Sequence, residues 1–194
     1  MPGATGWPAG AIGRIRQMSD PKRLYVLRHA KSSWEEHDAA DHELSLSERG
    51  RRAVRVVATY MEAEGIEPEL VLCSTARRTR ETLEGLRLTG TVLVEHRLYG
   101  ASADDLLERL RSLPTELGSV MLIGHNPALQ MLVMRLAGGE RSGRGEGVEG
   151  LEEIRRKLPT GALVTLETTD EWAELDVGSA ELVDYVRPKG LQFP

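Results

Sequence analysis

The sequence predicts one α/β domain, a three-layer α/β/α sandwich with a mainly parallel sheet. Three observations lead to this prediction. The chain of 194 residues is long enough for one full hydrophobic core. Hydrophobic residues make up 40% of it and charged residues 28%, which is typical of a globular protein. Short apolar runs alternate with stretches of helical periodicity over residues 22–137.

The expected strands of this alternation are the apolar runs 24–27 (LYVL), 70–73 (LVLC), 92–94 and 120–123 (VMLI). A helix is expected within 44–64, with Ser47 as its N-cap, because Val54, Val57 and Met61 share one helical face. Further helices are expected at 77–86, 103–113 and 128–136. Since a helix follows each strand, the strands should be parallel.

Four segments depart from this alternation. Residues 1–20 are rich in Gly, Ala and Pro, and predict a disordered extension, or sequence upstream of a start at Met18, before a domain spanning 21–194. Residues 138–150 (GGERSGRGEGVEG) predict a flexible loop with a short charged helix after it. The runs 162–167 and 182–186 predict late strands at the sheet edge.

Charge and cysteine content argue against several classes of protein. The chain has 25 Lys and Arg against 30 Asp and Glu, a net charge of −5, which disfavours a nucleic-acid partner. The single cysteine, Cys73, excludes a disulfide within the chain and a cysteine-cluster metal site. No apolar run approaches the roughly 18 residues of a membrane span, and the first 20 residues lack the features of a signal peptide. We therefore expect a cytoplasmic protein with no membrane partner.

Basic and imidazole side chains follow three of the expected strands. Arg28 and His29 follow the first, Arg78 follows the second within 74–82 (STARRTRET), and His125 follows the fourth within Gly-His-Asn-Pro. In open α/β sheets, ligands bind beyond the carboxyl ends of the strands. Each segment alone is better explained as structural, but together they place two histidines and at least two arginines at one rim. A cationic cradle around an imidazole nucleophile is suited to phosphoryl transfer.

Six segments carry a family resemblance: LYVLRHAKSSW, STARRTRETL, LIGHNPAL, LSERGRRA, PTGALVTLE and VRPKGL. They resemble the histidine phosphatase superfamily, which includes the phosphoglycerate mutases, and within it the SixA-like phosphohistidine phosphatases. The resemblance extends from Lys22 to the C-terminus and implies a phosphoglycerate mutase-like fold. One departure is that Ala30 replaces the glycine of the family's commonest Arg-His-Gly motif.

The resemblance also implies roles for individual residues. His29 would be the nucleophile that becomes phosphorylated, and Arg28 would hold the phosphoryl oxygens. Arg78, four positions after Ser74, would be the second phosphate-binding arginine, and His125 would stabilise the charged transition state. The expected substrate-binding residues in the same segments are Lys31, Thr82 and Asn126.

A general acid is missing from the matching segments. Mutases and many phosphatases of the superfamily supply Glu or Asp from the loop after the third strand, where the spacing points to His96. Glu95 is one position away, and on a strand that shift reverses the side-chain direction. Phytase-like members carry Asp after the second histidine, where this chain has Asn126. A missing acid matters less for phosphohistidine, whose imidazole leaves readily once solvent protonates it, than for a phosphate ester.

The resulting expectation is a metal-independent phosphatase without a cofactor, which forms a phosphohistidine enzyme intermediate and dephosphorylates protein phosphohistidine. Two alternatives remain open. One is a phosphatase for a small phosphomonoester, with Glu95 or Asp104 as its acid; the other is a catalytically weak module that binds phosphorylated partners. In each case the pocket should bind phosphate-type anions. The acids and histidines of 35–38 and 41–42 lack the ligand spacing of a metal site and predict a solvated loop.

Overall fold

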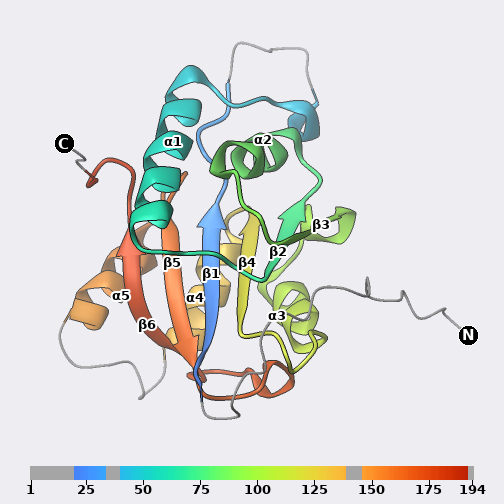
Figure 1. The fold of residues 1–194 in the computed structure, drawn as a ribbon, viewed down its shortest axis with the longest axis vertical. Helices are drawn as coiled ribbons and strands as arrows, with labels where there is room; N and C mark the ends of the chain where they lie inside the picture. Colours follow the sequence, from blue (N-terminus) through green and yellow to red (C-terminus); the bar gives the residue numbers. More distant parts are fainter. Residues whose placement is uncertain (1–19, 34–39, 139–145, 192–194) are drawn as a thin grey trace, which may run out of the picture.

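A computed structural model describes residues 20–33, 40–138 and 146–191 of the chain. Six strands form one sheet in the order β3-β2-β4-β1-β5-β6 (Figure 1). The strands are β1 (Lys22–Arg28), β2 (Leu70–Ser74), β3 (Thr91–Glu95), β4 (Ser119–Gly124), β5 (Leu163–Thr168) and β6 (Glu181–Val186). The helices are α1 (Glu48–Ala63), α2 (Arg77–Leu86), α3 (Ala103–Arg111), α4 (Ala128–Ala137) and α5 (Glu146–Arg156). Three short 3₁₀ helices are η1 (Asp41–Glu43), η2 (His96–Leu98) and η3 (Trp172–Glu174).

The sheet is mainly parallel, which confirms the predicted architecture. Strands β1, β4, β2 and β3 pair in parallel, and β5 is antiparallel to both of its neighbours, β1 and β6. The register pairs Arg28 with Gly124, and Ile123 with Cys73. The carboxyl ends of β1, β4 and β2 therefore lie side by side, and the three segments that follow them start from one rim of the sheet.

The position of β5 corrects one expectation. The sequence placed both late strands at the sheet edge, but β5 lies between β1 and β6, and only β6 is an edge strand. Five of the six β5 residues are buried, whereas β6 is mostly exposed or half-buried. Leu163 faces one apolar cluster and Val164 and Leu166 the other, so both faces of β5 are covered.

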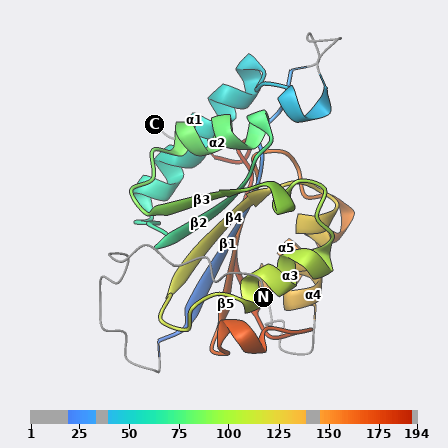
Figure 2. The same ribbon diagram turned by 90° about the vertical axis from the view of Figure 1, so that its right-hand side faces the viewer.

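Helices cover both faces of the sheet and complete the three layers (Figure 2). Helices α1 and α2 cover one face, where Tyr25 and Leu27 of β1 pack with Val54 and Val57. Helices α3, α4 and α5 cover the other face, which buries Leu24 and Val26 of the same strand. Alternate residues of one central strand therefore enter two separate apolar clusters, as expected for a sheet buried on both sides.

The helix boundaries follow local signals in the sequence, with one exception. The Ser47 side chain accepts a hydrogen bond from the Gly50 amide at 3.1 Å and caps α1 as predicted. Helix α5 begins at Glu146, inside the segment expected to be a loop. Leu151 and Ile154, three positions apart, are buried in the core, and this burial stabilises the helix. The remainder of that loop, 139–145, lies outside the described residues.

Other expectations also concern residues that the structure does not describe. Most of the expected N-terminal extension, residues 1–19, and the acidic segment 35–38 lie outside the described ranges. Within the described ranges, none of the helices combines the length and the apolar character needed to cross a membrane.

Candidate active site

Parallel pairing of β1 and β4 brings the two histidines together. The His29 amide donates to the Gly124 carbonyl at 3.1 Å, which continues the β1–β4 ladder by one residue. The ring centroids of His29 and His125 are 5.1 Å apart, although 96 positions separate them in the sequence. His29 is 7% exposed. Both rings therefore lie at the carboxyl ends of β1 and β4, at the rim where the sequence predicted the nucleophile.

The hydrogen bond of His29 fixes which ring nitrogen is available for reaction. Nδ1 lies 2.8 Å from the Ala30 carbonyl oxygen, which can only accept, so Nδ1 carries the proton and Nε2 keeps its lone pair. Burial of the ring, with a further contribution from the charges of Arg78 and Arg28, lowers the His29 pKa to about 4. The ring is therefore neutral at pH 7, as a nucleophilic imidazole must be.

Arg78 reaches the histidine pair from the first turn of α2. Its guanidinium donates to the Asp41 carbonyl and, at 2.9 Å, to the Asp41 carboxylate, and lies 3.4 Å from His125 Nδ1. Thr82, one turn later, accepts from the Ala30 amide at 3.1 Å and donates to the Arg78 carbonyl at 2.7 Å. Because the Thr82 hydroxyl is fully buried in these two bonds, its role in this geometry is to position α2 against the end of β1.

Arg28, at the end of β1, provides the second guanidinium of the site. Its Nη1 donates to the Leu158 carbonyl at 2.7 Å, while its Nε is buried and has no hydrogen-bond partner among the described residues. Burial lowers the pKa of Arg28, and repulsion from Arg78 adds to this. An arginine remains charged despite such a shift. A buried, unsatisfied cationic donor beside a nucleophile is suited to bind an anion.

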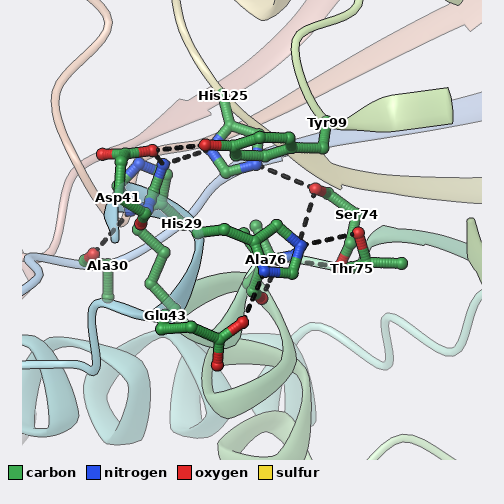
Figure 3. A network of polar contacts seen from close by, with 12 residues as sticks. His29, Ala30, Asp41, Glu43, Ser74, Thr75, Ala76, Tyr99 and His125 are labelled. Carbon is green, nitrogen blue, oxygen red and sulfur yellow. Dashed lines mark hydrogen bonds and ion pairs between the residues drawn. The ribbon is translucent and has the colours of Figure 1, made fainter. Parts of the chain in front are cut away.

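The His125 ring lies between Arg78 and Ser74. Its hydrogen bond to Ser74 can be followed in Figure 3. Its Nδ1 faces a guanidinium, which can only donate, so Nε2 carries the proton and donates to the Ser74 hydroxyl at 2.9 Å. Burial, followed by the charges of His29 and Arg78, lowers the His125 pKa to about 3. His125 is therefore neutral in this state of the site.

Two residues that sequence reasoning missed, Asp41 and Tyr99, complete the pocket (Figure 3). The Asp41 carboxylate accepts from the Tyr99 hydroxyl at 2.7 Å as well as from Arg78. These two hydrogen bonds, the one from Tyr99 first, lower the Asp41 pKa. The Tyr99 ring packs edge-on against His125, with centroids 5.6 Å apart. Because the ionised Asp41 carboxylate pairs with Arg78, the guanidinium is oriented toward a position that an anion can occupy.

No sequence signal marked Asp41, which the sequence placed in a solvated loop. Its side chain is indeed 64% exposed, and η1 is too short for a helical period. The neighbouring His42 bonds to Thr75 at 2.9 Å and to Glu43 at 2.7 Å. In the part of the chain that the structure describes, no group of three or more His, Cys, Asp or Glu side chains has a metal-binding arrangement.

The other two expected substrate-binding residues border the site in different ways. Asn126 Nδ2 donates to the Gln130 side chain at 3.0 Å and to the Leu158 carbonyl at 3.2 Å. The Lys31 carbonyl accepts two hydrogen bonds from Ser47, from its amide and its hydroxyl, each at 2.9 Å. The Lys31 backbone therefore ties the segment after His29 to the start of α1.

The two alternative acids are held in ion pairs with arginines. Both Glu95 oxygens accept from Arg109 at 2.8–3.1 Å, and one also accepts from Arg97 at 2.7 Å. Although burial alone would raise the Glu95 pKa, the hydrogen bonds from Arg109 and Arg97 outweigh it and lower the pKa. Asp104 is exposed and paired with Arg135. A general acid must be protonated and must reach the leaving group. Glu95, ionised and bonded to Arg109 and Arg97, does not meet the first requirement.

Replacement of Glu95 by Gln should therefore affect folding more than catalysis. We expect Glu95→Gln to change kcat by less than tenfold, because no proton is transferred from this group. We expect it to lower the free energy of unfolding by about 1–3 kcal/mol, because a charged partner of the buried Arg109 is lost. Urea unfolding and kcat on an alkyl phosphate would measure both effects. A loss of several hundredfold on the alkyl phosphate, with p-nitrophenyl phosphate spared, would instead make Glu95 the acid.

Comparison with known proteins agrees with this geometry. The model of the histidine phosphatase superfamily, branch 1, matches residues 24–99, which contain Arg28, His29 and Arg78. An uncharacterized protein from Mycobacterium leprae is 30% identical over 166 residues, 84% of this chain and 100% of that protein. A candidate phosphohistidine phosphatase SixA from Nakamurella multipartitia superposes with a TM-score of 0.75. The chain belongs to the histidine phosphatase superfamily.

The likeness to SixA-type members of the superfamily extends over nearly the whole chain. The Nakamurella structure is 26% identical and covers 87% of this chain and 96% of its own. A second candidate phosphohistidine phosphatase SixA, from Agrobacterium tumefaciens, has a TM-score of 0.72 and 26% identity, and covers 88% of this chain and 100% of its own. The family model ends at residue 99, before β4 and His125.

The two neutral histidines of this histidine phosphatase should make its stability depend on pH. The folded-state pKa values, about 4 for His29 and about 3 for His125, lie below the 6.5 of an unperturbed histidine. At a pH below about 6.5 the unfolded chain therefore binds more protons than the folded protein does. The free energy of unfolding consequently falls as the pH falls. We expect the melting temperature to fall between pH 7 and pH 4.5, and to fall less in the double variant His29→Asn, His125→Asn. Equal pH dependence of the two proteins would contradict this assignment.

Proposed function

We propose that this member of the histidine phosphatase superfamily dephosphorylates protein phosphohistidine, with His29 as the nucleophile. One observation supports the proposal most directly: His29 keeps an unprotonated Nε2, its ring is subject to the charges of Arg78 and Arg28, and a second histidine lies beside it. An imidazole in a cationic cradle is equipped for phosphoryl transfer to nitrogen. The positive charge comes from Arg28 and Arg78, so the proposed reaction uses no metal ion or cofactor.

The geometry supports a two-step reaction. The substrate phosphoryl group would displace the Asp41 carboxylate from Arg78 and would also bind the unpartnered Nε of Arg28. His29 Nε2 would then attack phosphorus, forming a P–N bond as the bond to the leaving group breaks. His125, whose ring centroid lies 5.1 Å from that of His29, would bind the phosphoryl oxygens by turning its Nε2–H from Ser74 to them. Attack of water on phosphorylated His29 would release phosphate and restore the free imidazole.

Phosphohistidine fits this site better than a phosphate ester. An alkoxide leaving group needs a proton, and a general acid that supplies one is worth about 10²–10⁴-fold in rate. Among the described carboxylates, Asp41 is the one bonded to a site arginine, and its pKa is lowered. Glu95 and Asp104 are paired with arginines elsewhere. Imidazole leaves without such an acid, and the two SixA-type structures carry the name of phosphohistidine phosphatases.

Relative rates on three substrates test the proposal. We expect kcat/KM for a phosphohistidine peptide and for p-nitrophenyl phosphate to exceed that for glycerol phosphate by at least about 10²-fold, the contribution of one missing acid. If glycerol phosphate or a sugar phosphate is turned over faster than the phosphohistidine peptide, the enzyme is a small-molecule phosphatase. Saturable binding of the phosphopeptide without turnover would make the chain a binding module instead.

A further inference from the structure

A small cavity adjoins the site on the side of α3 and α4. Its volume is about 230 Å³, below the roughly 300–1,000 Å³ of sites for drug-sized ligands. Its walls include the apolar residues Leu98, Ala101, Leu106 and Leu122. The two lining residues with polar side chains are His125 and Asn126. His125 belongs to the proposed phosphoryl site as well, so the cavity begins where that site ends.

Asn126, one of the lining residues, carries an unsatisfied acceptor in its side chain. Its Nδ2 donates to the Leu158 carbonyl and to Gln130 Oε1, and because both partners are acceptors the orientation of the amide is fixed. Its Oδ1 is buried and has no hydrogen-bond partner among the described residues. Leaving a buried acceptor unpaired is costly, so the site is built for a ligand that donates. The Leu158 carbonyl also binds Arg28, which places Asn126 next to the phosphoryl cradle.

We propose that this cavity binds the imidazole ring of the leaving histidine, and that Asn126 Oδ1 accepts a hydrogen bond from the ring N–H remote from phosphorus. This inference rests on the proposed function. The cavity is large enough for a five-membered ring, and its apolar walls suit the ring carbons. The one donor that such a ring offers away from phosphorus matches Asn126 Oδ1, a buried acceptor without a hydrogen-bond partner among the described residues.

This contact explains how the site can work without a general acid. A phosphoimidazole with hydrogen on the remote nitrogen is in its protonated form, and the hydrogen bond to Asn126 favours that form. As His29 Nε2 forms its bond to phosphorus, the electron pair of the breaking P–N bond passes to the leaving nitrogen. That pair neutralises the ring, whose proton stays on the remote nitrogen. The leaving group is neutral imidazole, and no proton has to reach the bond that breaks.

Five phosphoryl donors and three variants test the inference. Phosphoimidazole has the ring and the N–H, its N-methyl derivative has the ring without the N–H, and phosphoramidate releases ammonia and has no ring. We expect Asn126→Leu to lower the ratio of kcat/KM for phosphoimidazole over phosphoramidate by tenfold or more, and to abolish the preference for phosphoimidazole over its N-methyl derivative. Ala101→Leu, which fills the cavity, should lower the first ratio similarly. The matched change Ala173→Leu, at an exposed position in η3, should leave both ratios unaltered.

The outcomes separate this inference from the proposed function. Suppose that the wild type hydrolyses phosphoimidazole and that both ratios in Asn126→Leu and Ala101→Leu stay within twofold of the wild-type values. The ring then binds elsewhere, and the inference that it binds in this cavity is wrong. If the wild type hydrolyses p-nitrophenyl phosphate, the fourth donor, but neither phosphoimidazole nor a phosphohistidine peptide, the proposed function is wrong. Should Asn126→Leu fail to fold, Ala101→Leu still tests whether the ring binds in the cavity, because this variant fills the cavity and leaves the amide of Asn126 in place.

Discussion

The variant His29→Ala should lose its covalent phosphoryl group and at least about 10⁴-fold in kcat, because no other side chain in the site can take the place of the nucleophile. The hydrogen bond from His29 Nδ1 to the Ala30 carbonyl leaves His29 Nε2 unprotonated. His125 Nε2, in contrast, carries a proton and donates it to Ser74. The wild type, quenched during turnover, should carry a phosphoryl group that is labile to acid and stable to base. Mass spectrometry of peptides from the quenched enzyme would locate it on His29.

The matched control for this variant is His96→Ala. His96 is an exposed histidine of η2, stacked on His42 with ring centroids 6.4 Å apart, and it is not part of the histidine pair. We expect it to keep both the label and the wild-type kcat within a few fold. If His29→Ala instead retains more than a few per cent of wild-type turnover, the reaction does not pass through His29 and the proposed mechanism is wrong.

The variant Arg78→Ala should lose about 10²–10³-fold in kcat, the range found when one donor to a developing charge is removed. Arg78 faces Asp41 with two nitrogens and lies 3.4 Å from His125, so it contacts both the anion site and the second histidine. Arg78→Lys should recover only part of the loss, because an ammonium group keeps the charge without the two-pronged geometry of guanidinium. Steady-state kinetics on p-nitrophenyl phosphate would measure both variants.

Anion binding provides a readout of Arg78 that does not depend on turnover. Tungstate, used as a phosphate mimic, should raise the melting temperature of the wild type, since a ligand that binds only the folded state stabilises it. Arg78→Ala should abolish most of that increase. Arg77→Ala, one position away and paired with Glu81, should preserve both the increase and kcat. A normal tungstate response in Arg78→Ala would show that Arg78 does not hold the anion.

The layers of the fold, and the strand ends that carry the site, could be predicted from the sequence alone. Periodicity is a local property, so it placed α2 and the cap of α1 where the structure has them. Strand–helix alternation predicted parallel pairing, and parallel pairing brought His29 and His125 together. These inferences succeeded because each depends on neighbours in the chain or on the fixed direction of parallel strands.

The other groups that meet at that rim could be identified from the folded chain and not from the sequence. Asp41 and Tyr99 join Arg78 from two short segments without a period, and the Leu158 carbonyl reaches Arg28 across 130 positions. The pairing of Glu95 with Arg109, and the place of β5 inside the sheet, were equally undetermined. Such contacts depend on how loops close between distant elements. The closure is stabilised by hydrogen bonds and burial that no local pattern encodes.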